Sequence, residues 1–300
     1  MSARRKLGYS ILGAYLLGMV VIVLIFGAAR QDNELFQPAD EFKLLSWLDL
    51  PGPLDLNKGV LYLAIAAALT IGIMMYVANR MQDRPNRLQT AVEWLYTGMR
   101  DRIVADNMDD HMARKWFPLV CTLFVFIWIS NLIGYLPLPV NTDPHAQVNI
   151  FGVEVPGFQI YAATANVAIP LVLALIVWVA YNVEGIKAKG VVGYTKSMIP
   201  PGVKGPILIM IFPIEVLSHF LRLISLTVRL FANILAGHML IQFMGGGLAV
   251  LMGMEVLAWF TLPFGIAIYL FEATLVAGLQ AFIFAILTCI YLGSAVSHSH

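Results

Sequence analysis

Arg229 lies in the middle of the largely apolar run ISLTVRLFANILAGH, residues 224–238, near the C-terminus. A guanidinium keeps its charge in a protein, so its presence at membrane depth is costly unless water or a partner stabilises it. Ionisable residues inside membrane segments commonly mark ion paths, proton relays or counter-ions. We therefore take Arg229 as the first candidate functional residue.

Other polar residues share a helical face with this arginine. At about 100° per residue, five side chains fall within roughly a quarter-turn of one another: Glu215, His219, Arg222, Arg229 and Asn233. Most neighbouring residues are aliphatic, and His238 points to the opposite side. The stripe therefore lines an aqueous cleft or faces a charged partner. A purely structural Glu215–Arg222 pair is the alternative, although seven residues exceed the spacing for direct pairing along one helix.

A second apolar segment contains Glu272 and Gln280. A buried carboxylate can take up and pass on a proton, which makes Glu272 a candidate for a proton relay. Gln280 is equally well explained as a hydrogen-bonding residue between membrane helices.

The composition indicates a membrane protein. Hydrophobic residues make up 59% of the chain and charged residues 12%, against roughly one in four charged residues in soluble domains. The net charge of +1 gives no reason to expect a nucleic acid partner, which requires a basic face or stripe. Cys121 and Cys289 lie in apolar runs without metal-ligand spacing, so we expect small buried side chains and no metal or cofactor.

The hydropathy pattern predicts an all-α polytopic fold. A membrane helix needs about 20 apolar residues, and four ordinary spans meet this length, at 7–28, 59–78, 116–138 and 161–183. The apolar region that follows is too long for ordinary spans, and we expect two long, strongly tilted helices at about 207–244 and 250–294.

The distribution of Lys and Arg predicts the topology and the domains. Basic residues concentrate before the first predicted span, between the second and third, and after the fourth, which places these segments inside. We expect residues 1–30 to be an N-terminal anchor or a cleaved signal segment, residues 31–58 an external loop, and residues 59–300 the membrane domain. The apolar spacing from Leu88 to Met99 predicts an interfacial amphipathic helix, which we interpret as a surface brace.

Two motifs around the polar residues resemble subunit a of the F-type ATP synthases. They are SLTVRLFANILAGH at residues 225–238 and LQAFIFAILTCIYL at residues 279–292. The stretches SNLIGYLP at 130–137 and PIE at 213–215 are also similar to that family. The resemblance covers most of the chain from about Gly59 onward and does not include the N-terminal apolar segment.

The resemblance implies a proton-translocating stator subunit beside a rotating ring of c subunits. The further partners would be the peripheral-stalk b subunits, the rest of the F-type ATP synthase and membrane lipid, in a bacterial inner (cell) membrane. Protons would cross through two half-channels, and Arg229 would draw the ring carboxylate into its ionised form. The chain would not be an enzyme on its own, because nucleotide chemistry occurs elsewhere in the complex. The ring carries the ion-binding carboxylate, so sodium stays open beside protons.

The resemblance also assigns individual positions. Glu215 matches an acidic residue of the cytoplasmic outlet, Asn233 and Gln280 match residues that line the path, and His238 matches the titratable position after Ala-Gly. His219 is a further relay candidate from its place in the stripe. Each of these residues could instead be a satisfied interior polar group.

The position of Glu272 departs from the family pattern. The family has a Glu or His seven residues before the glutamine, whereas Ala273 occupies that position here and Glu272 lies one residue earlier. On a regular helix this turns the carboxylate by about 100°, away from a pairing with His238 in the inlet. A π-type bulge would restore the direction.

Two other functions fit part of the pattern. A stand-alone proton channel or secondary transporter would also use buried charges, but commonly shows two related halves, and the sequence has no internal repeat. A membrane scaffold without transport would leave Arg229 unexplained.

Overall fold

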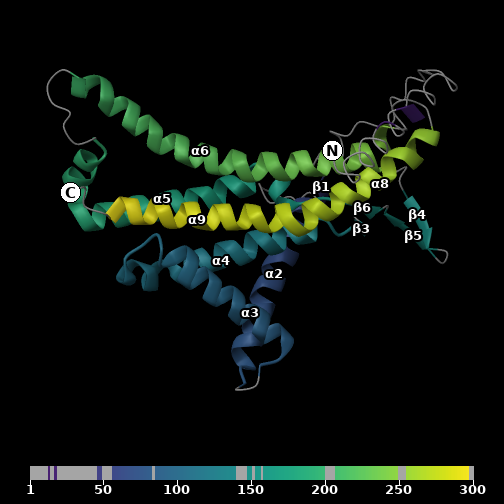
Figure 1. Cartoon of the computed structure of the whole chain (residues 1–300), viewed down its shortest axis with the longest axis horizontal. Coiled ribbons are helices and arrows are strands. Elements are labelled where there is room, and N and C mark those ends of the chain that lie inside the picture. Colours follow the sequence, from purple (N-terminus) through teal and green to yellow (C-terminus); the bar gives the residue numbers. More distant parts are fainter. Residues whose placement is uncertain are drawn as a thin grey trace, which may run out of the picture. The chain divides into compact units, whose positions relative to one another are not determined.

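The computed structural model describes residues 56–82, 85–139, 158–199, 207–248 and 255–296, with the short stretches 46–48, 147–150 and 153–156 and residues 13, 17 and 18. Within these residues, five helices are long and apolar enough to cross a membrane, which confirms the all-α polytopic membrane fold (Figure 1). The predicted span at 7–28 lies outside the described residues, apart from Gly13, Leu17 and Gly18, and so does most of the predicted external loop.

The chain forms two compact units. The larger unit contains Leu44–Ile234 and Leu275–His300, and the smaller unit contains Met1–Lys43 and Leu235–Thr274. Helix α6 (Ile207–Gln242) and the π-helical segment η5 (Glu272–Val276) each run from one unit into the other.

Four helices form the core of the larger unit: α2 (Lys58–Asn79), α4 (Asp110–Gly134), α5 (Ala168–Ser197) and α9 (Ala277–Val296). Helix α9 packs against α4 and α5, and α2 packs against α4. The buried face of α9 carries small side chains, including Ala277, Ala281 and Ala285. Small residues let membrane helices approach closely, so this face sets the tight packing of α9.

An ion pair between an exposed lysine and a largely buried glutamate also joins two of these helices. Lys115 of α4 pairs with Glu184 of α5, and the Glu184 side chain is largely buried. The pair fixes α5 beside α4, because a buried carboxylate without a cation would be costly.

Local interactions decide where the helices begin and end. The Asn57 side chain accepts a hydrogen bond from the Val60 amide at 3.1 Å and caps α2, and Asn166 accepts one from the Ala168 amide at 3.0 Å at the start of α5. Helix α4 ends at Gly134, where Ala162 packs so closely that a Cβ has no room. These ends differ from the predicted spans 116–138 and 161–183, because hydropathy does not separate apolar turns from helix.

The segment between α4 and α5 contains short antiparallel strands. Strand β3 (Leu138–Pro139) pairs with β6 (Phe158–Gln159), and β4 (Gln147–Ile150) pairs with β5 (Val153–Pro156). Earlier in the chain, β1 (Ser46–Leu48) pairs with β2 (Leu56–Asn57). A 3₁₀ turn, η3 (Ala163–Ala165), then leads towards α5.

A buried aromatic cluster connects this segment to α2. The Tyr62 and Tyr161 rings meet edge to face with centroids 5.6 Å apart, and the Lys58 ammonium lies 5.1 Å from the centre of the Tyr161 ring. The Tyr62 hydroxyl donates to the Leu136 carbonyl at 3.4 Å. Burial raises the pKa of Tyr161 to about 12, so its phenol stays neutral at physiological pH.

The predicted amphipathic helix is present as α3 (Arg87–Gly98), followed by the π-helical segment η2 (Met99–Val104). The Asn86 side chain accepts a hydrogen bond from the Gln89 amide at 2.8 Å and caps α3. Its role as a surface brace stays a prediction.

The described part of the smaller unit is built around two packed segments. The end of α6 continues into η4 (Phe243–Gly247), which packs against α8 (Glu255–Phe271). Gly265 lies against the Met244 backbone, with the position of a Cβ only 3.1 Å from the Met244 carbonyl oxygen. Two long apolar helical runs therefore occupy the C-terminal region, at 207–247 and 255–296.

We predict that Gly134→Ala destabilises the chain by about 1–3 kcal/mol, because the added methyl group must displace Ala162 or the end of α4. The measurement is the aggregation temperature of the chain in mild detergent. Gly72→Ala in α2 is the matched control, since its Cβ meets nothing within 4 Å. Equal aggregation temperatures for both variants would contradict the proposed close contact at Gly134.

Candidate functional site

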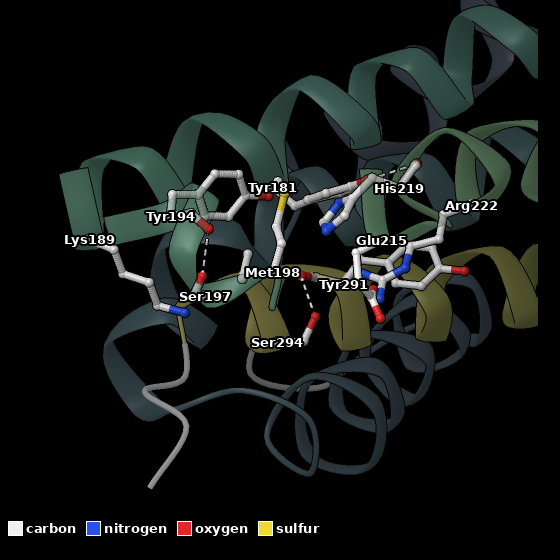
Figure 2. Close-up of a pocket in the computed structure, with 11 residues that line it drawn as sticks. Tyr181, Lys189, Tyr194, Ser197, Met198, Glu215, His219, Arg222, Tyr291 and Ser294 are labelled. Carbon is white, nitrogen blue, oxygen red and sulfur yellow. Dashed lines mark hydrogen bonds between the residues drawn. The ribbon is translucent and has the colours of Figure 1, made fainter. Parts of the chain in front are cut away.

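A polar pocket of about 200 Å³ lies among α5, α6 and α9 in the larger unit (Figure 2). It brings together three residues of the predicted stripe, Glu215, His219 and Arg222, with side chains from the other two helices. The full lining is Tyr181, Lys189, Tyr194, Ser197, Met198, Glu215, His219, Arg222, Tyr291, Ser294 and Ala295. Candidate residues that the sequence places on one helical face therefore border a real cavity.

Aromatic side chains of α5 connect this helix to α6. The indole of Trp178 donates to the His219 carbonyl at 3.2 Å, and the Tyr181 hydroxyl donates to the same oxygen at 3.5 Å. The Trp178 and Phe220 rings lie 5.6 Å apart. These contacts hold His219 at the pocket while its backbone stays within α6.

The His219 ring lies between two tyrosines. Its centroid is 6.0 Å from that of Tyr181 and 6.3 Å from that of Tyr194. Its Nδ1 atom is buried and has no hydrogen-bond partner among the described residues. A buried polar atom of this kind is stabilised by a hydrogen bond, and a water molecule in the adjoining polar pocket could supply it.

Arg222 is held by an aromatic ring. Its guanidinium lies 5.4 Å from the centre of the Tyr291 ring on α9, a cation–π geometry. Within the described part of the chain, no ion pair joins Arg222 to Glu215. The structural Glu215–Arg222 pair considered from the sequence is therefore not formed, and the Glu215 carboxylate stays available at the pocket.

Arg229 lies two turns further along α6, at the border between a buried and an exposed face. Leu226 and Leu230 are buried, whereas Ser225 and Asn233 are exposed. Among the described residues, Arg229 forms no ion pair with a carboxylate. A permanent charge in such a setting depends on water or on a partner outside the chain.

The face of α6 beside this arginine is apolar and uncovered. Its exposed side chains recur at intervals of three and four residues, at Met210, Ile214, Leu217, Leu221, Ile224 and Val228. Such a continuous stripe is a helix-packing surface. Within the described residues this surface faces lipid or another protein.

Glu272 and His238 lie in the smaller unit. The π-helical segment η5 begins at Glu272, and π-turns appear as single-turn bulges within α-helices. The Glu272 carboxylate packs directly against Gly237, which leaves no space there for a Cβ. The structure therefore contains a π-type bulge at the point where the sequence analysis considered one. The Glu272 carboxylate contacts Gly237, which directly precedes the buried His238.

Gln280 is buried on α9, and a nearby asparagine was missed by the sequence analysis. Asn131 donates to the Ala277 carbonyl at 3.2 Å and accepts a hydrogen bond from the Thr164 hydroxyl at 2.8 Å. It fastens α9 to α4 directly after the π-helical segment. Asn131 lies inside the SNLIGYLP motif, and this position could have identified it as a candidate from the sequence.

The pocket tyrosines and Lys189 were also missed. They come from α5 and α9, so no spacing along a single helix could group them with Glu215 and His219.

Comparison with known proteins identifies the family. Residues 60–293 match the family model described as ATP synthase A chain. The chain belongs to this family. It is 33% identical over 266 residues to ATP synthase subunit a of Hyphomonas neptunium, covering 86% of this chain and 95% of that protein. It is 37% identical over 245 residues to ATP synthase subunit a of Bradyrhizobium diazoefficiens, covering 80% and 88% respectively.

Family membership confirms the resemblance to F-type subunit a. The chain is a multi-pass membrane protein with a role in ATP synthesis and proton transport. It is a proton-translocating stator subunit of the membrane sector. The stand-alone transporter and the scaffold without transport are therefore set aside.

Proposed function

We propose that Arg229 is the stator arginine of this subunit and faces the proton-carrying carboxylate of a rotating c-subunit ring. The observation that carries the proposal is a guanidinium on an apolar membrane helix with no carboxylate partner among the described residues. Its neighbours Ser225 and Asn233 are exposed, so a partner can approach from that side. The uncovered apolar stripe of α6 is the surface that packs against the ring.

Electrostatics explains the role. A permanent cation beside a carboxylate favours the ionised form, so a ring carboxylate that reaches Arg229 releases its proton. The same positive charge repels a free proton and blocks a direct leak between the two aqueous sides. Each proton that crosses 100 mV yields about 2.3 kcal/mol, so several must pass for each ATP.

The pocket lined by Glu215 and His219 is the proposed cytoplasmic outlet. Its cytoplasmic location is supported by the positive-inside rule, because this end of α5 carries Lys187, Lys189 and Lys196. A carboxylate and an imidazole beside a polar cavity can pass a proton to water. The proton leaves the ring at Arg229 and reaches the cytoplasm through this pocket.

His238 and Glu272 are the proposed inlet residues, and Asn233 and Gln280 are further residues proposed for the proton path. The Glu272 carboxylate contacts Gly237, the residue before the buried His238. A carboxylate and an imidazole can both bind and release a proton, so these two side chains suit a proton relay. Protons are the proposed ion because both half-channels contain histidine.

The remaining proposals concern the setting of the chain. Peripheral-stalk b subunits are further partners, the membrane is the bacterial inner membrane, and the chain carries out no nucleotide chemistry. Residues 1–30 form an anchor or signal segment, residues 31–58 an external loop and residues 59–300 the membrane domain.

Arg229→Ala should abolish ATP-driven proton pumping while the complex still assembles, because the ring carboxylate loses the cation that ionises it. Pumping is measured as acidification of inverted membrane vesicles, and assembly as the amount of c subunit that co-purifies. Ser225→Ala, one turn away on the same face, is the matched control and should pump normally. Normal pumping by Arg229→Ala would refute the assigned role.

Glu272→Gln should slow passive proton flux through the membrane sector, since an amide cannot bind and release a proton in the relevant range. The measurement is the decay of an imposed pH gradient in vesicles stripped of the catalytic sector. Thr274→Val, which changes a neighbouring exposed side chain, is the control. An unchanged proton flux in Glu272→Gln would contradict the relay role and indicate that Glu272 is a structural residue.

Gly237→Ala should also slow this flux, by about tenfold or more, because the new methyl group displaces the Glu272 carboxylate. Adding Glu272→Asp shortens the acid by one methylene and should restore part of the flux. Gly245→Ala in the same unit is the control, as its Cβ meets nothing within 4 Å. If Gly237→Ala conducts like Gly245→Ala, the contact does not position the acid.

A further inference from the structure

Helix α5 is interrupted near its end by Gly190, which has φ +71° and ψ 163°. This φ lies in the region that glycine adopts without strain. Twelve residues of straight helix would separate Asn182 from Tyr194 by about 18 Å, yet the Tyr194 hydroxyl donates to the Asn182 side-chain oxygen at 3.0 Å. Residues 191–198, here called the fold-back segment, therefore return along α5.

One side chain seats the fold-back segment on α5. The Tyr194 ring packs directly on Gly185, where no Cβ could fit, and Tyr194 is 4% exposed. By contrast, Val191 and Val192 are strongly exposed. The contact of the Tyr194 ring with Gly185 and its hydrogen bond to Asn182 thus attach the fold-back segment to the rest of α5.

The same segment forms one wall of the polar pocket. Tyr194, Ser197 and Met198 line one side, and Lys189, just before the hinge, adjoins them. The opposite wall is formed by residues of α6 and α9 (Figure 2). The Tyr194 ring meets the His219 ring at 71° with centroids 6.3 Å apart, so the side chain that seats the segment also borders the candidate relay.

We propose that Tyr194, seated on Gly185, is a positioning residue that sets how far the proton outlet opens to the aqueous side. When the ring is seated, the fold-back segment closes one side of the pocket around His219. When it leaves Gly185, Gly190 acts as the hinge and the pocket opens. This inference rests on the outlet role proposed above for Glu215 and His219.

The test measures how fast a thiol at the pocket reacts from the cytoplasmic side. Ser294, which is exposed and lines the pocket, is replaced by cysteine in a chain carrying Cys121→Ala and Cys289→Ala. The intact ATP synthase in inverted vesicles is treated with a membrane-impermeant cationic methanethiosulfonate reagent. A second reporter, Asp106→Cys, lies at an exposed position outside the pocket.

Two variants disturb the seat from opposite sides. Gly185→Ala adds a methyl group under the ring, and Tyr194→Ala removes the ring. Each should raise the labelling rate at position 294 by about tenfold, the change given by weakening the seat by about 1.4 kcal/mol, and leave labelling at position 106 unchanged. Tyr194→Phe keeps the ring but loses the hydrogen bond to Asn182, so its rate should lie between those of Tyr194→Ala and the parent.

Gly193→Ala is the matched control, because its Cβ would meet only the Lys189 Cβ at an ordinary 3.4 Å. The proposal is overturned if the two seat variants label position 294 at the parent rate, or if Gly193→Ala raises the rate equally. Should Gly185→Ala fail to assemble, Tyr194→Ala decides, since it removes atoms instead of adding them. The labelling rate does not depend on proton pumping. Normal pumping by Arg229→Ala would therefore refute the proposed function but leave the labelling result unchanged.

Discussion

A guanidinium that cannot lose its charge, carried on an apolar membrane helix, is the constraint around which this chain is arranged. The cost of that charge falls when water or an opposite charge lies near it, and the described residues supply no carboxylate partner for Arg229. Helix α6 meets this constraint by presenting two different faces. One face contacts α5 and α9 through aromatic side chains such as Trp178 and Tyr291, while the apolar face beside Arg229 stays uncovered.

The contact between α6 and its neighbours also leaves room for chemistry. Long side chains bridge the helices instead of a close-packed seam, and the space between them is the polar pocket. The α4–α9 contact is the opposite case, because small residues such as Ala281 and Ala285 bring the helices close. The same fold therefore holds a closely packed core and a polar pocket, according to the size of the side chains at each helix contact.

Several glycines mark places where another part of the chain comes very near, and three of them bear on the helix ends and the candidate site. Gly134 admits Ala162, Gly185 admits the Tyr194 ring, and Gly237 admits the Glu272 carboxylate. In each case the missing Cβ is what allows the contact. Gly185 and Gly237 each hold a side chain of the proposed proton path or its surroundings, so their effect would come through the groups that they position.

Much of the fold could be predicted from the chain alone. Membrane helices satisfy their own backbone hydrogen bonds, so apolar length and helical period are local properties that locate the long helices and put Glu215, His219, Arg222 and Arg229 on one face. The family motifs around Arg229 are equally local. Hydropathy did not predict the end of α4 or the start of α5, because the flanking residues 135–138 and 161–167 are also largely apolar.

Only the tertiary structure decided which side chains from different helices meet. The pocket joins Tyr181 and Tyr194 of α5 to His219 of α6 and Tyr291 of α9, and no period along one helix contains that relation. The spacing between Glu272 and Gln280 does not determine where the Glu272 side chain points. In the structure, a π-helical segment begins at Glu272, and its carboxylate contacts Gly237. Periodicity is a property of one helix, but a site depends on how several helices pack, and packing is decided by contacts between residues far apart in the chain.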